Sequence, residues 1–383
     1  MTTTAGLLVL EDAGVFQGTL FGAPGAGVAA GEVVFNTAMC GYEEVLTDPS
    51  YRGQIVVMTS PHQGNYGITL EDAESSRPHL AGFVVGELSE FPSNWRAKIS
   101  LNDYLKQNKI AGLSGVDTRA LTLTIRSSGA LRGAIIRAPK TGLSRAIERA
   151  VAAIKAHPAM EGLGLAQEVS VGQASLWNDN ALKPFDGHAS GRPRAAVWDF
   201  GVKWSILRSL EARGFDALVF PYQSTAREIL DAKPQGIVLS NGPGDPAALG
   251  HAIGEIRRII DEPRHPPVLG ICLGHQLLGL ACGGRTYKMK FGHHGVNHPV
   301  RDASTGRVWI SSHNHGFTVD SQSLPNDVKV THLSLNDRTV EGLACEDRGF
   351  ISVQFHPESA PGPWEARGVF GQFKQMAEAA SGR

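Results

Sequence analysis

In the second half of the chain, short apolar runs alternate with longer stretches whose apolar residues recur at helical spacing. The apolar runs predict strands at residues 195–200, 217–220, 236–240 and 267–271. The helical spacing predicts helices over 204–213, ending at Gly214, over 224–232, capped by Ser224, and from 246 to about 261. Such alternation favours a parallel sheet that binds its ligands at the carboxyl ends of the strands.

The pattern differs elsewhere. After Gly284, strands joined by turns are predicted at 307–310, 328–331 and 350–355, followed by a helix over 364–379. The first half predicts strands at 7–10 and 54–58, a polar loop at 61–67 and a helix at about 143–157. We therefore predict an α/β protein of two domains, an N-terminal α/β domain of unassigned topology and a C-terminal, mostly parallel open sheet flanked by helices.

A segment rich in glycine, proline and polar residues separates the two halves. It runs from Pro184 to Arg194 and has no apolar periodicity, so it is interpreted as a linker. The predicted domains are residues 1–184 and 194–383, with the linker at 185–193. A chain of 383 residues with 42% hydrophobic residues is long enough for two domains of ordinary size.

Composition argues against several classes of partner. The net charge is -1 and no basic run occurs, which argues against nucleic acid and anionic membranes. No apolar stretch has the length of a membrane span, and residues 1–6 lack the positive region of a signal peptide. The four cysteines form no CxxC pair, which indicates thiols in a reducing compartment. A cytoplasmic location is expected.

The strongest chemical signal is Cys272, which lies between Gly270 and Gly274 where a strand meets a helix. An abrupt strand-to-helix turn exposes a nucleophile, and glycines allow the close backbone approach that the turn needs. The partial positive charge of the helix N-terminus favours thiolate. The N–H of Leu273 is the natural oxyanion donor, and an N–H from the loop Gly242-Pro243-Gly244 is a candidate for the second.

A candidate base and its orienting group follow a later strand. His356 precedes Pro357, and Glu358 lies on the same side of the chain if the backbone stays extended. A carboxylate there can fix the tautomer of the histidine and stabilise its cation. Cys272, His356 and Glu358 are therefore predicted to be a nucleophile, base and orienter for acyl transfer.

Other candidates receive weaker interpretations. Cys40, Cys282 and Cys345 are interpreted as small hydrophobic residues. Histidines at 293, 294, 298, 313 and 315 suggest a metal site, but no carboxylate pair or CxxC lies nearby in the sequence, so no metal is predicted. The glycine loop at 242–244 lacks the Lys-Ser/Thr of a P-loop, so no ATP site is predicted in this chain.

Three runs together resemble the class I, triad-type glutamine amidotransferase domain. They are Gly270-Ile271-Cys272-Leu273-Gly274-His275-Gln276, Asn241-Gly242-Pro243-Gly244-Asp245-Pro246 and Phe355-His356-Pro357-Glu358. The resemblance covers about residues 194–383. It implies a glutaminase in which Cys272 attacks the side-chain amide of L-glutamine, ammonia leaves, and water releases glutamate from the thioester.

The first half resembles the small chain of carbamoyl-phosphate synthetase. The resemblance is carried by the runs Phe35 to Gln54, Pro61 to Gly67 and Gly115 to Thr122. Cys40 stands where a Thr or Ser is common. The resemblance implies backbone contacts to glutamine from Gly242, Gly244 and Leu273. It implies further contacts from Ser50, Gln276, Asn314, Gly316 and Phe317.

The same resemblance implies a partner. A large synthetase chain would receive ammonia, bind ATP with a divalent metal, and make carbamoyl phosphate from bicarbonate for arginine and pyrimidine biosynthesis. The N-terminal domain would dock that chain in a heterodimer or a higher assembly. Three alternatives stay open: a free-standing γ-glutamyl hydrolase, an amidotransferase subunit of another synthase, and a non-catalytic scaffold, which the intact Cys272, His356 and Glu358 disfavour.

Overall fold

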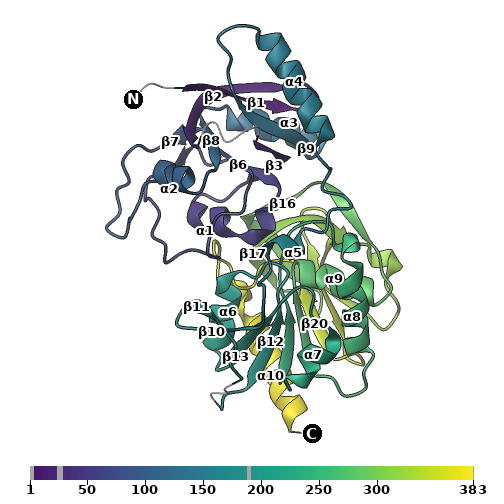
Figure 1. Ribbon diagram of the computed structural model, residues 1–383. Coiled ribbons are helices and arrows are strands. Elements are labelled where there is room, and N and C mark those ends of the chain that lie inside the picture. Colours follow the sequence, from purple (N-terminus) through teal and green to yellow (C-terminus); the bar gives the residue numbers. More distant parts are fainter. Residues whose placement is uncertain (1–3, 24–28, 188–190, 383) are drawn as a thin grey trace. The chain divides into compact units, whose positions relative to one another are not determined.

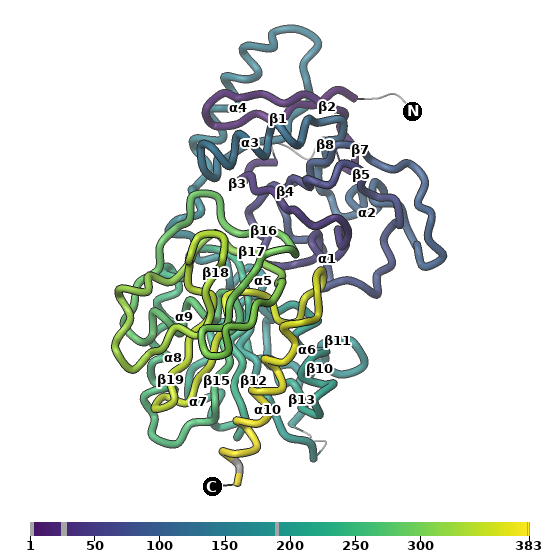
Figure 2. The backbone as a smooth tube through the Cα atoms, turned by 180° about the vertical axis from the view of Figure 1, so that it is seen from behind, coloured from purple at the N-terminus to yellow at the C-terminus, as the bar shows by residue number. Residues whose placement is uncertain are grey.

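The computed structural model describes residues 4–23, 29–187 and 191–382. These form two compact units (Figures 1 and 2). One comprises residues 1–160 with 290–295, and the other comprises 161–289 with 296–383. No helix among the described residues is both long and apolar enough to cross a membrane.

The N-terminal unit is built around a closed seven-stranded barrel, a topology that the sequence pattern left unassigned. The strands follow the order β1 (Thr4–Leu10), β2 (Val15–Gly22), β8 (Ala111–Ser114), β6 (Gly82–Val84), β4 (Gln54–Met58), β3 (Ala29–Asn36) and β9 (Leu131–Arg137). Apolar residues fill the barrel, among them Leu8, Val33, Ile55 and Leu113. Closure pairs both edges of the sheet, so the barrel leaves no open edge strand.

Short helices and turns complete this unit. They are α1 (Tyr42–Thr47), η1 (Pro49–Tyr51), α2 (Leu101–Gln107), α3 (Thr118–Ser128) and α4 (Leu143–Ala156), with the two-stranded pair β5 (His62–Gln63) and β7 (Glu87–Leu88). The predicted strands at 7–10 and 54–58 and the helix at 143–157 are therefore confirmed. The predicted loop at 61–67 contains the short strand β5.

The C-terminal unit contains an eleven-stranded sheet. Its parallel centre has the order β13 (Asp216–Phe220), β12 (Arg194–Trp198), β14 (Gly236–Leu239), β15 (Val268–Ile271) and β20 (Phe350–Val353). Antiparallel strands extend both sides: β10 (Ser175–Asn178) and β11 (Ala181–Pro184) next to β13, and β19 (Val340–Cys345), β18 (Lys329–Ser334), β16 (Thr286–Asp302) and β17 (Val308–Val319) beyond β20. The parallel part is thus limited to the centre.

Helices cover both faces of this sheet, because alternate strand residues are apolar on both sides. Ala196 and Trp198 of β12 pack in one core with α7 (Ala226–Asp231), α8 (Gly250–Ile260) and α9 (Leu273–Ala281). Ala195 and Val197 pack in the other with α6 (Trp204–Glu211) and α10 (Gly368–Ser381). Figure 2 shows α10 running along the sheet to the C-terminus. The two cores fix the strand ends that carry the site described below.

Two details differ from the sequence-based predictions, and part of a third prediction is not described by the structure. The compact units divide after Met160, because β10 pairs with β13 and adds residues 175–184 to the C-terminal sheet. Of the predicted linker, residues 188–190 lie outside the described residues. Helix α7 is capped by Thr225 and not by Ser224, since the Thr225 side chain and Glu228 form a reciprocal capping box.

Short 3₁₀ turns complete the C-terminal unit, together with one further helix. These are α5 (Ala166–Val169), η2 (Pro246–Ala248), η3 (Ser321–Ser323) and η4 (Glu365–Arg367). All four cysteines are free thiols. Cys282 and Cys345 are buried, as predicted, whereas Cys40 is exposed and its interpretation as a small buried hydrophobic residue is wrong.

Candidate active site

Cys272 occupies the corner between β15 and α9. Its φ of 52° and ψ of -103° are a strained backbone conformation for a residue with a side chain. A Cβ on Gly270 would meet the carbonyl oxygen of Gly274, and a Cβ on Gly274 would clash with the carbonyl oxygen of Leu239. The structure therefore confirms the elbow and the need for a glycine on each side of it.

The corner places the thiol at the N-terminus of α9, where the first backbone N–H groups have no acceptor within the helix. Gly274 N donates to Ser240 O at 3.0 Å, which ties the first turn of the helix to the end of β14. Leu273 N, the first helical N–H, stays the candidate oxyanion donor. The helix dipole favours negative charge on the sulfur.

His356 and Glu358 lie as their spacing predicts. His356 Nδ1 is 2.6 Å from Glu358 Oε1, and both side chains are buried. His356 N donates to Ser312 O at 2.8 Å, which fixes the backbone of this segment beside β17. The carboxylate therefore accepts the Nδ1 proton and leaves Nε2 as the atom that exchanges protons.

Lys203 is a further member of this site that sequence reasoning missed. Its Nζ lies 3.0 Å from Glu358 Oε1 and 2.6 Å from Ser359 O, and its side chain is only 3% exposed. It follows β12, in a loop whose N–H groups at Gly201 and Val202 donate to Asp199. The only signal in the sequence was its place after a strand, which many solvated lysines share.

Charge controls protonation in this buried group. Burial lowers the pKa of His356, but the Glu358 carboxylate and then Cys272 outweigh it and raise that pKa to about 10. Burial raises the pKa of Glu358, but Lys203 and His356 outweigh it and lower that pKa to about 2. The site therefore holds a carboxylate between two cations, with the imidazolium next to the thiol.

The thiol also touches residues of β17 and the segment after β20. Cys272 Sγ is 3.6 Å from Asn314 O, and Gln354 Nε2 lies 3.7 Å from the sulfur. Gln276 Nε2 donates to Phe317 O at 2.8 Å and to Gln354 Oε1 at 3.0 Å. The structure thus brings Gln276, Asn314 and Phe317 together around Cys272, with Gly316 between the last two in the chain.

The loop after β14 needs glycine at both predicted positions. A Cβ on Gly242 would clash with the carbonyl oxygen of Phe200 and lie 2.9 Å from Leu273 Cδ2. Gly244 has a φ of +92° and lies against the carbonyl oxygen of Leu163. Gly242 therefore lies next to the first turn of α9, which follows Cys272. The backbone of Phe200 comes so close to Gly242 that no side chain fits there.

Comparisons with known proteins agree with this geometry. Residues 196–376 match the family described as glutamine amidotransferase class-I, and residues 8–135 match the carbamoyl-phosphate synthase small chain, CPSase domain. The chain is 50% identical to a carbamoyl phosphate synthase small chain from Solidesulfovibrio magneticus, over 98% of this chain and 99% of that protein. It belongs to the carbamoyl-phosphate synthase small-chain family. The small chain of Thioalkalivibrio sulfidiphilus is 47% identical, over 98% of each chain.

Within this small-chain family member, one predicted glutamine contact lies in the other compact unit. Ser50 is in η1 of the N-terminal unit, where its N–H donates to Asp48 Oδ1 at 2.8 Å. Its contact with glutamine stays a prediction. The other predicted contacts, and Cys272, His356 and Glu358, belong to the C-terminal unit.

Proposed function

We propose that this chain is the glutaminase subunit of a glutamine-dependent carbamoyl-phosphate synthase, with Cys272 as its nucleophile. The observation that carries the proposal is the contact of the buried Glu358 with His356, beside a thiol on a strained strand-to-helix corner. Class I amidotransferase and small-chain family membership support L-glutamine as the substrate.

In the first half of the reaction, the sulfur of Cys272 attacks the side-chain amide carbon of glutamine. In the reacting form the sulfur is a thiolate and His356 is an imidazolium, whose Nε2 holds the proton that the thiol has given up. The oxyanion is held by the N–H of Leu273 with a second N–H from the loop at 242–244. The C–N bond then breaks, and His356 gives its proton to the departing nitrogen. Ammonia and a γ-glutamyl thioester on Cys272 are the products.

In the second half, water attacks the thioester carbon while His356 accepts a proton from it. The C–S bond breaks, the sulfur leaves as a thiolate beside the imidazolium of His356, and glutamate leaves. Glu358 and Lys203 do not touch the reacting atoms. They hold His356 in one tautomer and orientation through both steps.

The proposed partner is a large synthetase chain. It would take up the ammonia, bind ATP with a divalent metal, and form carbamoyl phosphate from bicarbonate for arginine and pyrimidine biosynthesis. The small-chain CPSase match at residues 8–135 supports a docking role for the N-terminal unit in a heterodimer or a higher assembly. The same match disfavours an amidotransferase subunit of another synthase.

Glutamate release from glutamine tests this assignment. The purified chain is assayed alone, and then with a large synthetase chain, ATP and bicarbonate. We expect weak activity alone that rises when the partner and its substrates are added. Strong activity that is indifferent to the partner would instead identify a free-standing γ-glutamyl hydrolase.

The charge on Glu358 predicts a pH effect. Because the pKa of His356 is raised to about 10, its imidazolium persists through neutral pH and is lost as pH rises towards that value. Glu358→Gln removes the main group that outweighs burial, so the pKa of His356 falls. We expect the alkaline limb of kcat/KM for glutamine hydrolysis to move to lower pH, with a lower rate at pH 8.

The matched control is Glu378→Gln, because Glu378 is an exposed carboxylate on α10 that pairs only loosely with Lys374, at 3.7 Å. Its pH profile should match that of the natural chain. An alkaline limb that does not move in Glu358→Gln would show that Glu358 does not set the protonation of the base.

A further inference from the structure

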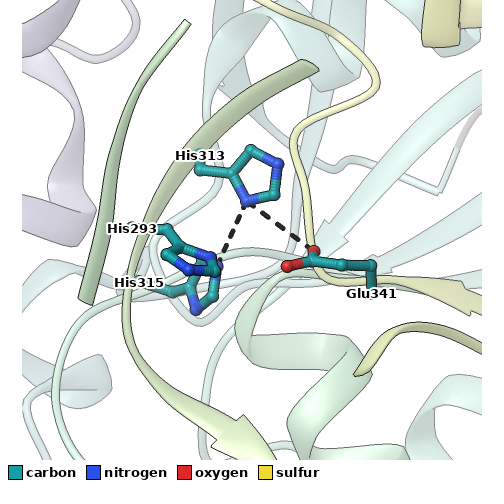
Figure 3. Close-up of side chains that lie close together, drawn as sticks. All are labelled: His293, His313, His315 and Glu341. Carbon is teal, nitrogen blue, oxygen red and sulfur yellow. Dashed lines mark hydrogen bonds and ion pairs between the residues drawn. The ribbon is translucent and has the colours of Figure 1, made fainter. Parts of the chain in front are cut away.

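Three buried side chains converge in the C-terminal unit outside the proposed triad. His313 and His315 lie on β17, and Glu341 lies on β19 (Figure 3). Residues i and i+2 of a strand point to the same face, which brings both rings to one side. His313 Nδ1 is 3.2 Å from His315 Nε2 and 3.7 Å from Glu341 Oε2.

The hydrogen bonds that His313 and His315 make with residues outside this group of three fix which ring nitrogen carries the proton. His315 Nδ1 is 2.9 Å from Phe317 O, a carbonyl that can only accept, so Nδ1 carries the hydrogen. Ser311 Oγ donates its single hydrogen to His298 O, and it lies 2.8 Å from His313 Nε2. His313 Nε2 is therefore the donor to Ser311. In the neutral rings, His313 Nδ1 and His315 Nε2 present lone pairs to each other.

The carboxylate of Glu341 is a third acceptor close to these two ring nitrogens. Glu341 is 0% exposed, and its other oxygen is 3.4 Å from Thr339 Oγ1. The donor atoms of the three side chains all lie within 4.8 Å of one another. Bonds of about 2.0–2.2 Å to a tetrahedral zinc ion place neighbouring ligand atoms about 3.3 Å apart, close to the separations found here.

We propose that His313, His315 and Glu341 bind one divalent transition-metal ion, with zinc the best match. Two imidazoles and one carboxylate suit zinc, and outer hydrogen bonds from metal-binding rings to a carbonyl and a hydroxyl are the usual support for such ligands. A fourth position is left for water or another ligand. His293, also labelled in Figure 3, belongs to the 290–295 segment of the other unit and is not counted among the three.

The site is tied to the candidate glutamine pocket by backbone. His315 lies between Asn314 and Gly316, and Phe317 O accepts from both His315 Nδ1 and Gln276 Nε2. A bound ion would hold this part of β17 in the position that faces Cys272. This consequence rests on the proposed function, whereas metal binding itself does not.

The test is zinc binding by the full-length chain, independent of its activity. The chain is stripped with a chelator and titrated with Zn²⁺, and bound metal is counted by elemental analysis. We expect one zinc per chain and a rise in melting temperature. Co²⁺ in its place should give the absorption bands of a tetrahedral site without thiolate-to-metal charge transfer, which separates this site from Cys272.

Glu341→Gln and His313→Gln should each weaken zinc binding by at least about 100-fold. Glu346→Gln, on a neighbouring turn and with an 88% exposed side chain, is the matched control and should bind as the natural chain does. Circular dichroism of the metal-free chain checks that each variant folds, and if one variant does not fold, the other decides the test. No zinc at micromolar concentration, or binding unchanged in both variants, would overturn the proposal, and the cluster would then hold a proton only.

Discussion

Cys272→Ser is expected to abolish glutamine-dependent carbamoyl phosphate synthesis while sparing synthesis from free ammonia. The hydroxyl of serine is a far weaker nucleophile than a thiolate. Position 272 lies at the N-terminus of α9 and beside a cationic His356, and both of these favour a thiolate over a thiol. We expect the rate of glutamine hydrolysis to fall by at least about 10⁴-fold. The measurement is carbamoyl phosphate formed by the reconstituted complex with either nitrogen source.

Ammonia-dependent synthesis serves as the internal control, because it requires the synthetase reaction of the partner but not the thiol. Cys282→Ser is a second control, since Cys282 is another buried thiol, at the far end of α9. It should keep glutamine-dependent activity. A Cys272→Ser complex that still uses glutamine well would show that another residue is the nucleophile.

Lys203→Met is expected to destabilise the fold and impair the site together. The side chains of Lys203 and Glu358 are 3% and 0% exposed. The substitution removes the ammonium group and leaves His356 as the charged partner of the Glu358 carboxylate. Removing one member of a buried ion pair costs about 3–5 kcal/mol. We expect a loss of that size in the free energy of unfolding, measured by urea denaturation, and a large fall in kcat for glutamine hydrolysis.

A double-mutant cycle isolates the charge effect. Lys203→Met combined with Glu358→Gln removes both charges, so the double variant should be more stable than Lys203→Met alone, although no more active. An exposed lysine, Lys329, pairs with Glu346 at 3.6 Å, and Lys329→Met should change stability by less than about 1 kcal/mol. A Lys203→Met chain as stable as the natural one would contradict a structural ion pair.

The features predicted from sequence are those set by local backbone chemistry. The corner at Cys272 follows from two glycines between an apolar run and a helix, and the contact of His356 with Glu358 follows from their spacing after a strand. Both involve residues a few positions apart. The parallel centre of the C-terminal sheet was predictable for the same reason, since each strand and helix carries its own periodicity.

The remaining features depend on partners far apart in the chain. Lys203 meets Glu358 only because β12 and the segment after β20 end near each other, and Glu341 reaches His313 only through the antiparallel strands beyond β20. The N-terminal barrel closes by pairing β1 with β9, which no local pattern encodes. Each of these contacts requires the strand order, which a single sequence does not specify.

The most direct test of the central claim is to trap the acyl intermediate. The chain is mixed with glutamine, quenched in acid, digested and examined by mass spectrometry. The account predicts a γ-glutamyl group on the peptide that carries Cys272, absent in Cys272→Ser and increased in any variant that slows the attack of water. A γ-glutamyl group on another residue, or glutamate formed in Cys272→Ser at the natural rate, would contradict a thioester at Cys272.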